Sequence, residues 1–128
     1  MPTFSHVLTS QVNNRGTVVG SDQTFTGGLE ANLSESIPEN STDLLVAWSV
    51  DVSQIQSIII EASADMTLET NAIDATGGNT ISLLAGVPYV WHTGSYFANL
   101  LTLDVLKLYI TNTTAGTLEI QCVVDPTA

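Results

Sequence analysis

Basic and reactive side chains are scarce in this chain. Its 128 residues include only two basic residues, Arg15 and Lys107, together with two histidines, His6 and His92, and a single cysteine, Cys122. Proteins that bind nucleic acid neutralise several phosphates with lysine and arginine, and anionic membranes attract clusters of the same residues. We therefore expect neither a nucleic acid nor a membrane as a partner of this protein.

Residues suited to catalysis or metal binding are equally sparse. Neither histidine has a second metal ligand at a standard spacing, and the sequence contains no cysteine pair, nucleotide-binding loop or nucleophile motif. Cys122 has the parity of an inward-facing residue on an expected strand, which favours a core side chain over a nucleophile. We predict that the protein is not an enzyme and that it holds no cofactor and no metal. Two facing carboxylates in a cleft, or His92 beside an acid, would argue for an enzyme instead.

The composition is otherwise that of an acidic chain whose polar residues suit the surface of β-sheets. Thirteen acidic residues give a formal net charge of -11, yet only 12% of all residues are charged. Most other polar residues are threonine, serine, asparagine and glutamine, which suit sheet surfaces. A chain of 128 residues with 44% hydrophobic content is long enough for one domain with one core.

Apolar residues recur with a period of two, the pattern of a half-buried strand. The alternation is clearest at 44–50, 66–69, 80–83, 106–111 and 117–124. Turn-forming residues separate these stretches, so strands recur about every ten residues. This spacing predicts an all-β fold, a single-domain antiparallel β-sandwich that is jelly-roll-like.

The turn residues predict particular connections. Asn13-Asn14-Arg15-Gly16 is typical of a hairpin turn, here between strands near 4–12 and 17–25. The segment from Asn112 to Gly116 predicts a second hairpin between the last two strands. Helix is scarce, and we expect a single turn at Val52 to Gln56 with Asp51 as its cap.

The segment from Val87 to Leu101 holds half of the chain's aromatic residues, grouped around a glycine-containing turn. Three interpretations stay open for this group. The rings can close one end of the sandwich as core, form a protein–protein contact, or stack on sugar rings. Trp48 and Phe25, in contrast, are expected in the core. The four aromatic residues of the segment are Tyr89, Trp91, Tyr96 and Phe97.

The order of short phrases along the chain is similar to that of the small β-sandwich decoration (cement) proteins of tailed-bacteriophage capsids. The likeness extends from about residue 7 to residue 124. It includes Asn-Arg-Gly, Thr-Phe-Thr-Gly-Gly, Ser-Ile-Pro-Glu-Asn-Ser and Ser-Ile-Ile-Ile, then Met-Thr-Leu-Glu-Thr-Asn, Thr-Ile-Ser-Leu-Leu-Ala-Gly-Val-Pro-Tyr-Val-Trp and Tyr-Ile-Thr-Asn-Thr-Thr-Ala-Gly-Thr-Leu-Glu-Ile. Such strings also occur in phage tail and fibre accessory proteins.

The resemblance implies a structural protein of the virion on the outer capsid surface. Its partners would be the major capsid protein and copies of itself, as a homotrimer that reinforces the shell. We expect residues 1–12 to form an N-terminal arm or first strand at the interface, and residues 13–128 to form the sandwich. The expected interface residues are Phe4 and Val7 in the arm, and Tyr89, Trp91, Tyr96 and Phe97 in the aromatic segment.

The alternative function is a carbohydrate- or receptor-binding β-sandwich module of a phage tail or fibre. This alternative rests on the same aromatic segment, because exposed rings can stack on sugars. Exposed, coplanar rings beside asparagine or aspartate would favour this alternative. Burial of all four rings would remove it.

Overall fold

The computed structural model describes residues 3–128, and these residues form β-strands almost throughout. Their one helical element is the single 3-10 turn η1 (Val52–Gln54), in which Asp51 accepts a hydrogen bond from the Ser53 N–H at 3.0 Å. The turn and cap expected there are confirmed. None of the described helical segments has the length and apolar character to cross a membrane.

A strand forms in each period-two segment of the sequence, but the strand expected over 44–50 ends at Val46 and the one expected over 106–111 begins at Leu108. In chain order they are β1 (Phe4–Asn14), β2 (Thr17–Gly27), β3 (Leu29–Glu30), β4 (Leu33–Ile37), β5 (Leu44–Val46), β6 (Ile55–Ala62), β7 (Met66–Thr70), β8 (Thr80–Leu83), β9 (Tyr89–His92), β10 (Leu108–Asn112) and β11 (Gly116–Val124).

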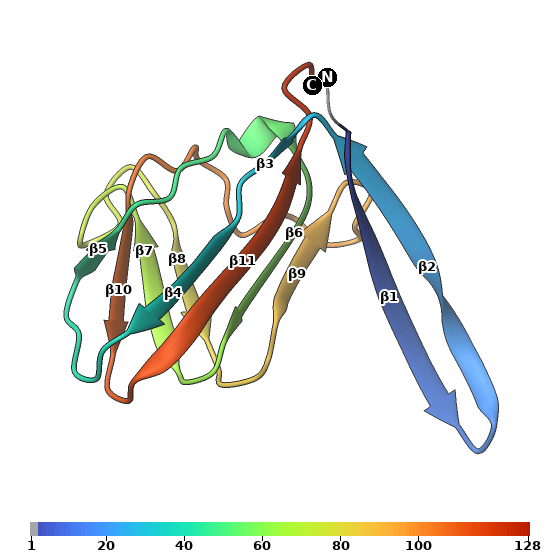
Figure 1. Cartoon of the computed structure of the whole chain (residues 1–128), viewed down its shortest axis with the longest axis horizontal. Helices are drawn as coiled ribbons and strands as arrows, with labels where there is room; N and C mark the ends of the chain where they lie inside the picture. Colours follow the sequence, from blue (N-terminus) through green and yellow to red (C-terminus); the bar gives the residue numbers. More distant parts are fainter. Residues whose placement is uncertain (1–2) are drawn as a thin grey trace.

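Two antiparallel sheets pack face to face (Figure 1). The β11 sheet has the order β3-β11-β6-β9, and β4 pairs with the other end of the β11 edge that β3 occupies. The β10 sheet has the order β5-β10-β7-β8. The predicted all-β antiparallel sandwich is therefore confirmed.

The core lies between the two sheets and explains the alternation of the sequence. Leu118, Ile120 and Cys122 of β11 are fully buried, and Ile110 of β10 is buried opposite them. Each such aliphatic side chain contributes about 1.5 to 3 kcal/mol when it leaves water. Trp48 is buried as expected, and its indole N–H donates to the Ala31 carbonyl oxygen at 3.0 Å.

The connection from Asn112 to Gly116 joins the two sheets, so the prediction of a hairpin between the last two strands was wrong. β10 pairs with β5 and β7, whereas β11 pairs with β3, β4 and β6. Each strand has one apolar face, and the two faces bury each other only from opposite sheets. The Asn112 side chain holds this arch, because it accepts from the Ser41 N–H and donates to the Thr114 carbonyl oxygen, both at 3.0 Å.

β1 and β2 form a hairpin that projects away from the sandwich, as Figure 1 shows. Their register runs without a break from Phe4 opposite Gly27 to Asn14 opposite Thr17. Arg15 and Gly16 form the turn with φ of 53° and 83°, the positive values that a two-residue type I′ turn requires. The expected hairpin is confirmed. The boundary expected between residues 12 and 13 falls inside β1, so β1 and β2 form one structural unit ahead of the sandwich.

Candidate binding surfaces

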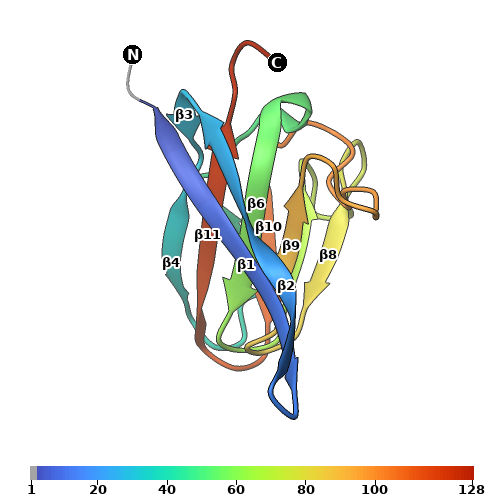
Figure 2. The same cartoon turned by 90° about the vertical axis from the view of Figure 1, so that its right-hand side faces the viewer.

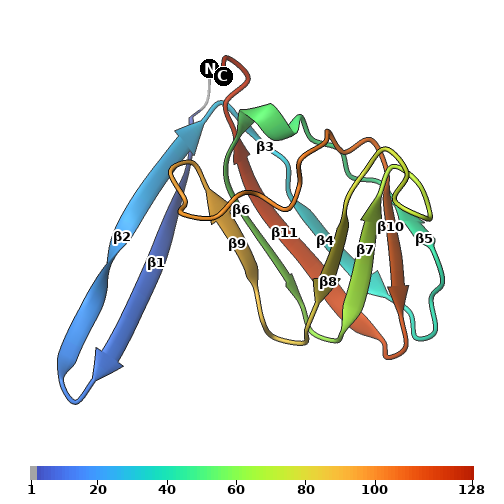
Figure 3. The ribbon, with the colours of Figure 1, turned by 180° about the vertical axis from the view of Figure 1, so that it is seen from behind.

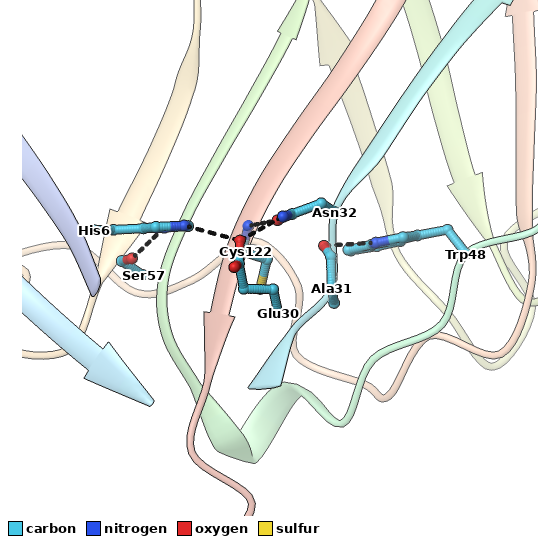
Figure 4. A network of polar contacts seen from close by, with 7 residues as sticks. All are labelled: His6, Glu30, Ala31, Asn32, Trp48, Ser57 and Cys122. Carbon is cyan, nitrogen blue, oxygen red and sulfur yellow. Dashed lines mark hydrogen bonds and ion pairs between the residues drawn. The ribbon is translucent and has the colours of Figure 1, made fainter. Parts of the chain in front are cut away.

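A small polar network fixes the base of the hairpin to the β11 sheet (Figure 4). His6 of β1 places Nδ1 at 3.2 Å from Ser57 Oγ and Nε2 at 3.6 Å from a carboxylate oxygen of Glu30. Asn32 continues the network, since its amide donates to Glu30 and its carbonyl oxygen accepts from the Cys122 N–H at 2.9 Å. The hairpin is thus linked to the central strand β11.

Close backbone packing completes this anchor. Gly27 lies so near the end of β11 that a Cβ on it would be 2.2 Å from the Val124 carbonyl oxygen. Phe25 lies half-buried on the hairpin and not in the core where we expected it, with its ring centroid 4.8 Å from that of the His92 ring at the end of β9. The base of the hairpin is therefore held closely by the sandwich.

The outer half of the hairpin has no such cover. Val12 and Val19 lie directly opposite each other and are 67% and 68% exposed. They share a hairpin face with Phe4, which is half-buried at the base, as strand parity requires. Val7 lies on the opposite face and is 56% exposed. The two residues expected as anchors in the arm thus have different surroundings.

Residues 93–107 form a long irregular loop that crosses the open edge between β8 and β9 (Figure 3). Leu101 and Val105 fasten this 93–107 loop by reaching into the core, where they are 1% and 0% exposed. The Asn79 side-chain oxygen accepts from the Thr102 N–H at 3.0 Å, and that of Asn71 accepts from the Leu106 N–H at 2.8 Å. Irregular loops of this length are uncommon unless they serve a function.

Two of the predicted interface residues, Tyr89 and Trp91, hold the 93–107 loop in place through hydrogen bonds. The Tyr89 hydroxyl donates to the Asn99 side-chain oxygen and accepts from the Leu100 N–H at 2.9 Å. Burial raises the pKa of Tyr89 because it disfavours the charged phenolate, so this hydroxyl remains a hydrogen-bond donor even at mildly alkaline pH. The Trp91 indole N–H donates to the Phe97 carbonyl oxygen at 3.0 Å. Tyr89 and Trp91 therefore position the loop.

The other two predicted residues face solvent. Tyr96 is fully exposed and Phe97 is 84% exposed. Large apolar side chains gathered on one surface loop mark an interaction site, and aromatic residues dominate such sites. Among residues 3–128 the aromatic rings in contact are those of Phe25 and His92, so the four predicted rings do not stack on one another. Three further exposed apolar residues of the same loop are Leu100, Leu103 and Leu106.

Sequence reasoning missed these three leucines. By hydropathy the stretch from Leu100 to Leu106 is typical of core, and only Leu101 and Val105 in it are inside. The alternation at 106–111 placed Leu106 on the inward face with Leu108 and Ile110, but β10 begins only at Leu108, so strand parity does not extend to Leu106.

A shallow pocket near η1 brings together Glu30, Asp51 and Asp104. Each of these three carboxylates already makes a polar contact with another residue of the chain. Asp51 caps η1, Glu30 contacts His6 and Asn32, and Asp104 accepts from the Val52 N–H at 2.9 Å. These contacts assign the three acids to holding loops and the hairpin base.

The thiol of Cys122 is enclosed by the core, as its parity predicts. Burial raises its pKa to about 12, because the thiolate is the form that loses hydration. We expect the native protein at pH 8 to leave a thiol-specific chromogenic reagent unreacted, and the unfolded protein to react completely. An introduced thiol at exposed Thr127 (T127C) is the control and should react at once. Fast reaction of native Cys122 would contradict this buried position.

Comparison with known proteins gives no match to this chain, whether the search is against family models, curated proteins or solved structures. Within residues 3–128, no three histidine, cysteine, aspartate or glutamate side chains are grouped to hold a metal ion.

Proposed function

We propose that this chain is a structural virion protein that binds the outer surface of a phage capsid as a homotrimer and stabilises the shell. The observation that carries the proposal is the display of Tyr96 and Phe97 on the braced 93–107 loop. The sequence resemblance to capsid decoration proteins supplies the partner. The major capsid protein would be the surface on which this loop docks.

The loop has the physical properties of a preorganised contact. Binding costs less when side chains and backbone are ordered beforehand, and Tyr89, Trp91 and Asn79 already order this loop. Apolar anchors such as Phe97 gain free energy when a partner removes them from water. Several weak contacts on one lattice then add up, because a trimer binds through three loops at once.

The order of strands supports the jelly-roll winding that we expected. Counting β3 and β4 as one interrupted strand, the nine strands from β3 to β11 become eight. The first then pairs with the eighth (β4 with β11), the second with the seventh (β5 with β10), the third with the sixth (β6 with β9) and the fourth with the fifth (β7 with β8). Such nested pairing is the winding of a jelly roll, an architecture found in viral capsid proteins and in lectins.

Mixing with empty shells tests the proposal. Shells are assembled from the major capsid protein encoded nearest to this gene, incubated with the protein and sedimented. We expect saturable co-sedimentation at a fixed number of copies per shell, and a mass of three times the 13.5 kDa chain for the free protein in light scattering. Absence of binding would contradict the proposal. Binding to a glycan array without shell binding would favour the carbohydrate-binding alternative. That alternative rests on the exposed rings of Tyr96 and Phe97.

A further inference from the structure

The outer half of the β1–β2 hairpin needs a cover that its own chain does not supply. An isolated two-stranded ribbon is marginally stable in water, and the sandwich covers only the base of this one. The exposed Val12 and Val19 pair continues the face whose base half is packed on the β11 sheet. A second surface packed on this face would remove both valines from water.

Charge is divided unevenly between the hairpin and the sandwich. Residues 3–28 contain Arg15 and Asp22 and are neutral in sum, with His6 uncharged. The remaining twelve acids and Lys107 give the rest of the chain the whole net charge of -11. Two sandwiches therefore repel each other, and the hairpin is the part of one copy that can approach another. Its turn carries the positive charge at the far tip.

An uncompensated pair of carboxylates lies on the outer face of the β11 sheet. Glu61 of β6 and Glu119 of β11 are directly opposite in the register, and with Ser63 and Thr117 they line a shallow pocket. Like charges in this position destabilise a sheet. Within the described part of the chain neither Arg15 nor Lys107 forms a salt bridge, so Glu61 and Glu119 have no cation of their own.

The hairpin is too long for Arg15 to meet Glu61 and Glu119 of the same copy. Its base is fixed where Gly27 meets Val124. From there the chain back along β2 to the turn, residues 27 to 15, extends about 40 Å, whereas residues 119–124 of β11 extend about 17 Å. Figures 1 and 2 show the turn of the hairpin beyond the lower end of the sandwich. Arg15 would therefore lie beyond Glu61 and Glu119 of its own chain.

We propose that the hairpin tip of one copy docks on the outer face of the β11 sheet of a second copy, with Arg15 between Glu61 and Glu119. The exposed Val12 and Val19 would lie over Ile59 and its cross-strand neighbour Val90, the apolar residues next to the two acids on that face. The contact is head-to-tail, so it closes into a ring when the rotation between copies allows it. The inference rests on the proposed function only for the number of copies in the homotrimer.

Charge reversal tests this contact in the free protein, without shells, so that its failure is separate from a failure of shell binding. The mass of the assembly is measured against concentration by light scattering. Arg15→Glu should weaken self-association by roughly a hundredfold, because it places three like charges together. Combining R15E with E61R and E119R in one chain should restore it. Lys107→Glu is the matched control, with the same change of charge far from the hairpin, and should have little effect.

Three results would overturn the proposal. They are a monomer at every concentration, an R15E variant that assembles as well as K107E, and a failure of the triple reversal to restore assembly. Circular dichroism of each variant keeps a folding defect from being taken for a lost contact. A second measurement uses cysteines in place of Arg15 and Glu119. The proposal predicts disulfide-linked oligomers, and a disulfide within one chain would contradict it.

Discussion

Replacing Tyr96 with serine and Phe97 with aspartate together (Y96S/F97D) should lower the affinity for the shell by at least about a hundredfold. Hot-spot residues cost about 2 kcal/mol or more each when removed, and two of them correspond to a factor of this size or larger. Both side chains are exposed, so the free energy of unfolding should stay within about 0.5 kcal/mol of that of the unchanged protein. Co-sedimentation over a range of concentrations measures the effect.

The control for this prediction is an exposed apolar residue elsewhere. Leu45 lies on the outer face of the β10 sheet and is 57% exposed, so Leu45→Ser removes a similar apolar side chain without touching the 93–107 loop. We expect its affinity for the shell to be unchanged. Equal losses for L45S and Y96S/F97D would show that shell binding does not depend on the loop.

Replacing Asn71 with alanine should destabilise the protein by about 3 kcal/mol, because it removes several hydrogen bonds to backbone groups and leaves alanine in an unfavourable backbone conformation. Its amide donates to the carbonyl oxygens of Gly77 and Asp104, both at 2.8 Å, and its oxygen accepts from the Leu106 N–H at 2.8 Å. The residue also has a φ of 71°, which alanine adopts at a cost of about 1 kcal/mol. Urea denaturation gives the change in the free energy of unfolding.

Asn40→Ala separates the contacts of Asn71 from its backbone conformation. Asn40 has a similar φ of 55°, and the hydrogen bond that it makes uses its backbone N–H. We expect this variant to lose only the conformational part, about 1 kcal/mol. If N71A and N40A are equally destabilised, the side-chain bonds of Asn71 do not hold the 93–107 loop.

Local chemistry made several elements predictable from the sequence. The Asn-Arg-Gly turn requires positive φ at two successive residues, and so specifies the β1–β2 hairpin without reference to the rest of the fold. The same is true of η1. Its cap, Asp51, directly precedes it and accepts a hydrogen bond from the N–H of Ser53, two residues further along the chain. The alternation in β10 and β11 specified the buried faces, since parity alone decides them.

Long-range pairing was not predictable in the same way. The residues from Asn112 to Gly116 suit a hairpin, and whether β10 and β11 pair or face each other depends on strands far away in the sequence, such as β4 and β6. The 93–107 loop was unpredictable for a related reason. Its fastenings are the side chains of Asn71, Asn79 and Tyr89, which lie on other segments.

The aromatic segment therefore contains two kinds of residue. Tyr89 and Trp91 are half-buried braces, while Tyr96 and Phe97 are exposed contacts. Sequence alone grouped all four as interface residues, because aromatic side chains serve in cores and interfaces alike. The hydrogen bonds to Leu100 and Phe97, together with the exposure of each ring, distinguish the two roles.

Electron cryo-microscopy of shells saturated with the protein tests the central claim most directly. The account predicts additional density at regular positions on the outer surface, with the 93–107 loop turned toward the capsid lattice and Tyr96 and Phe97 in contact with it. Bare shells after saturation would contradict the account, and so would bound copies whose loop points into solvent.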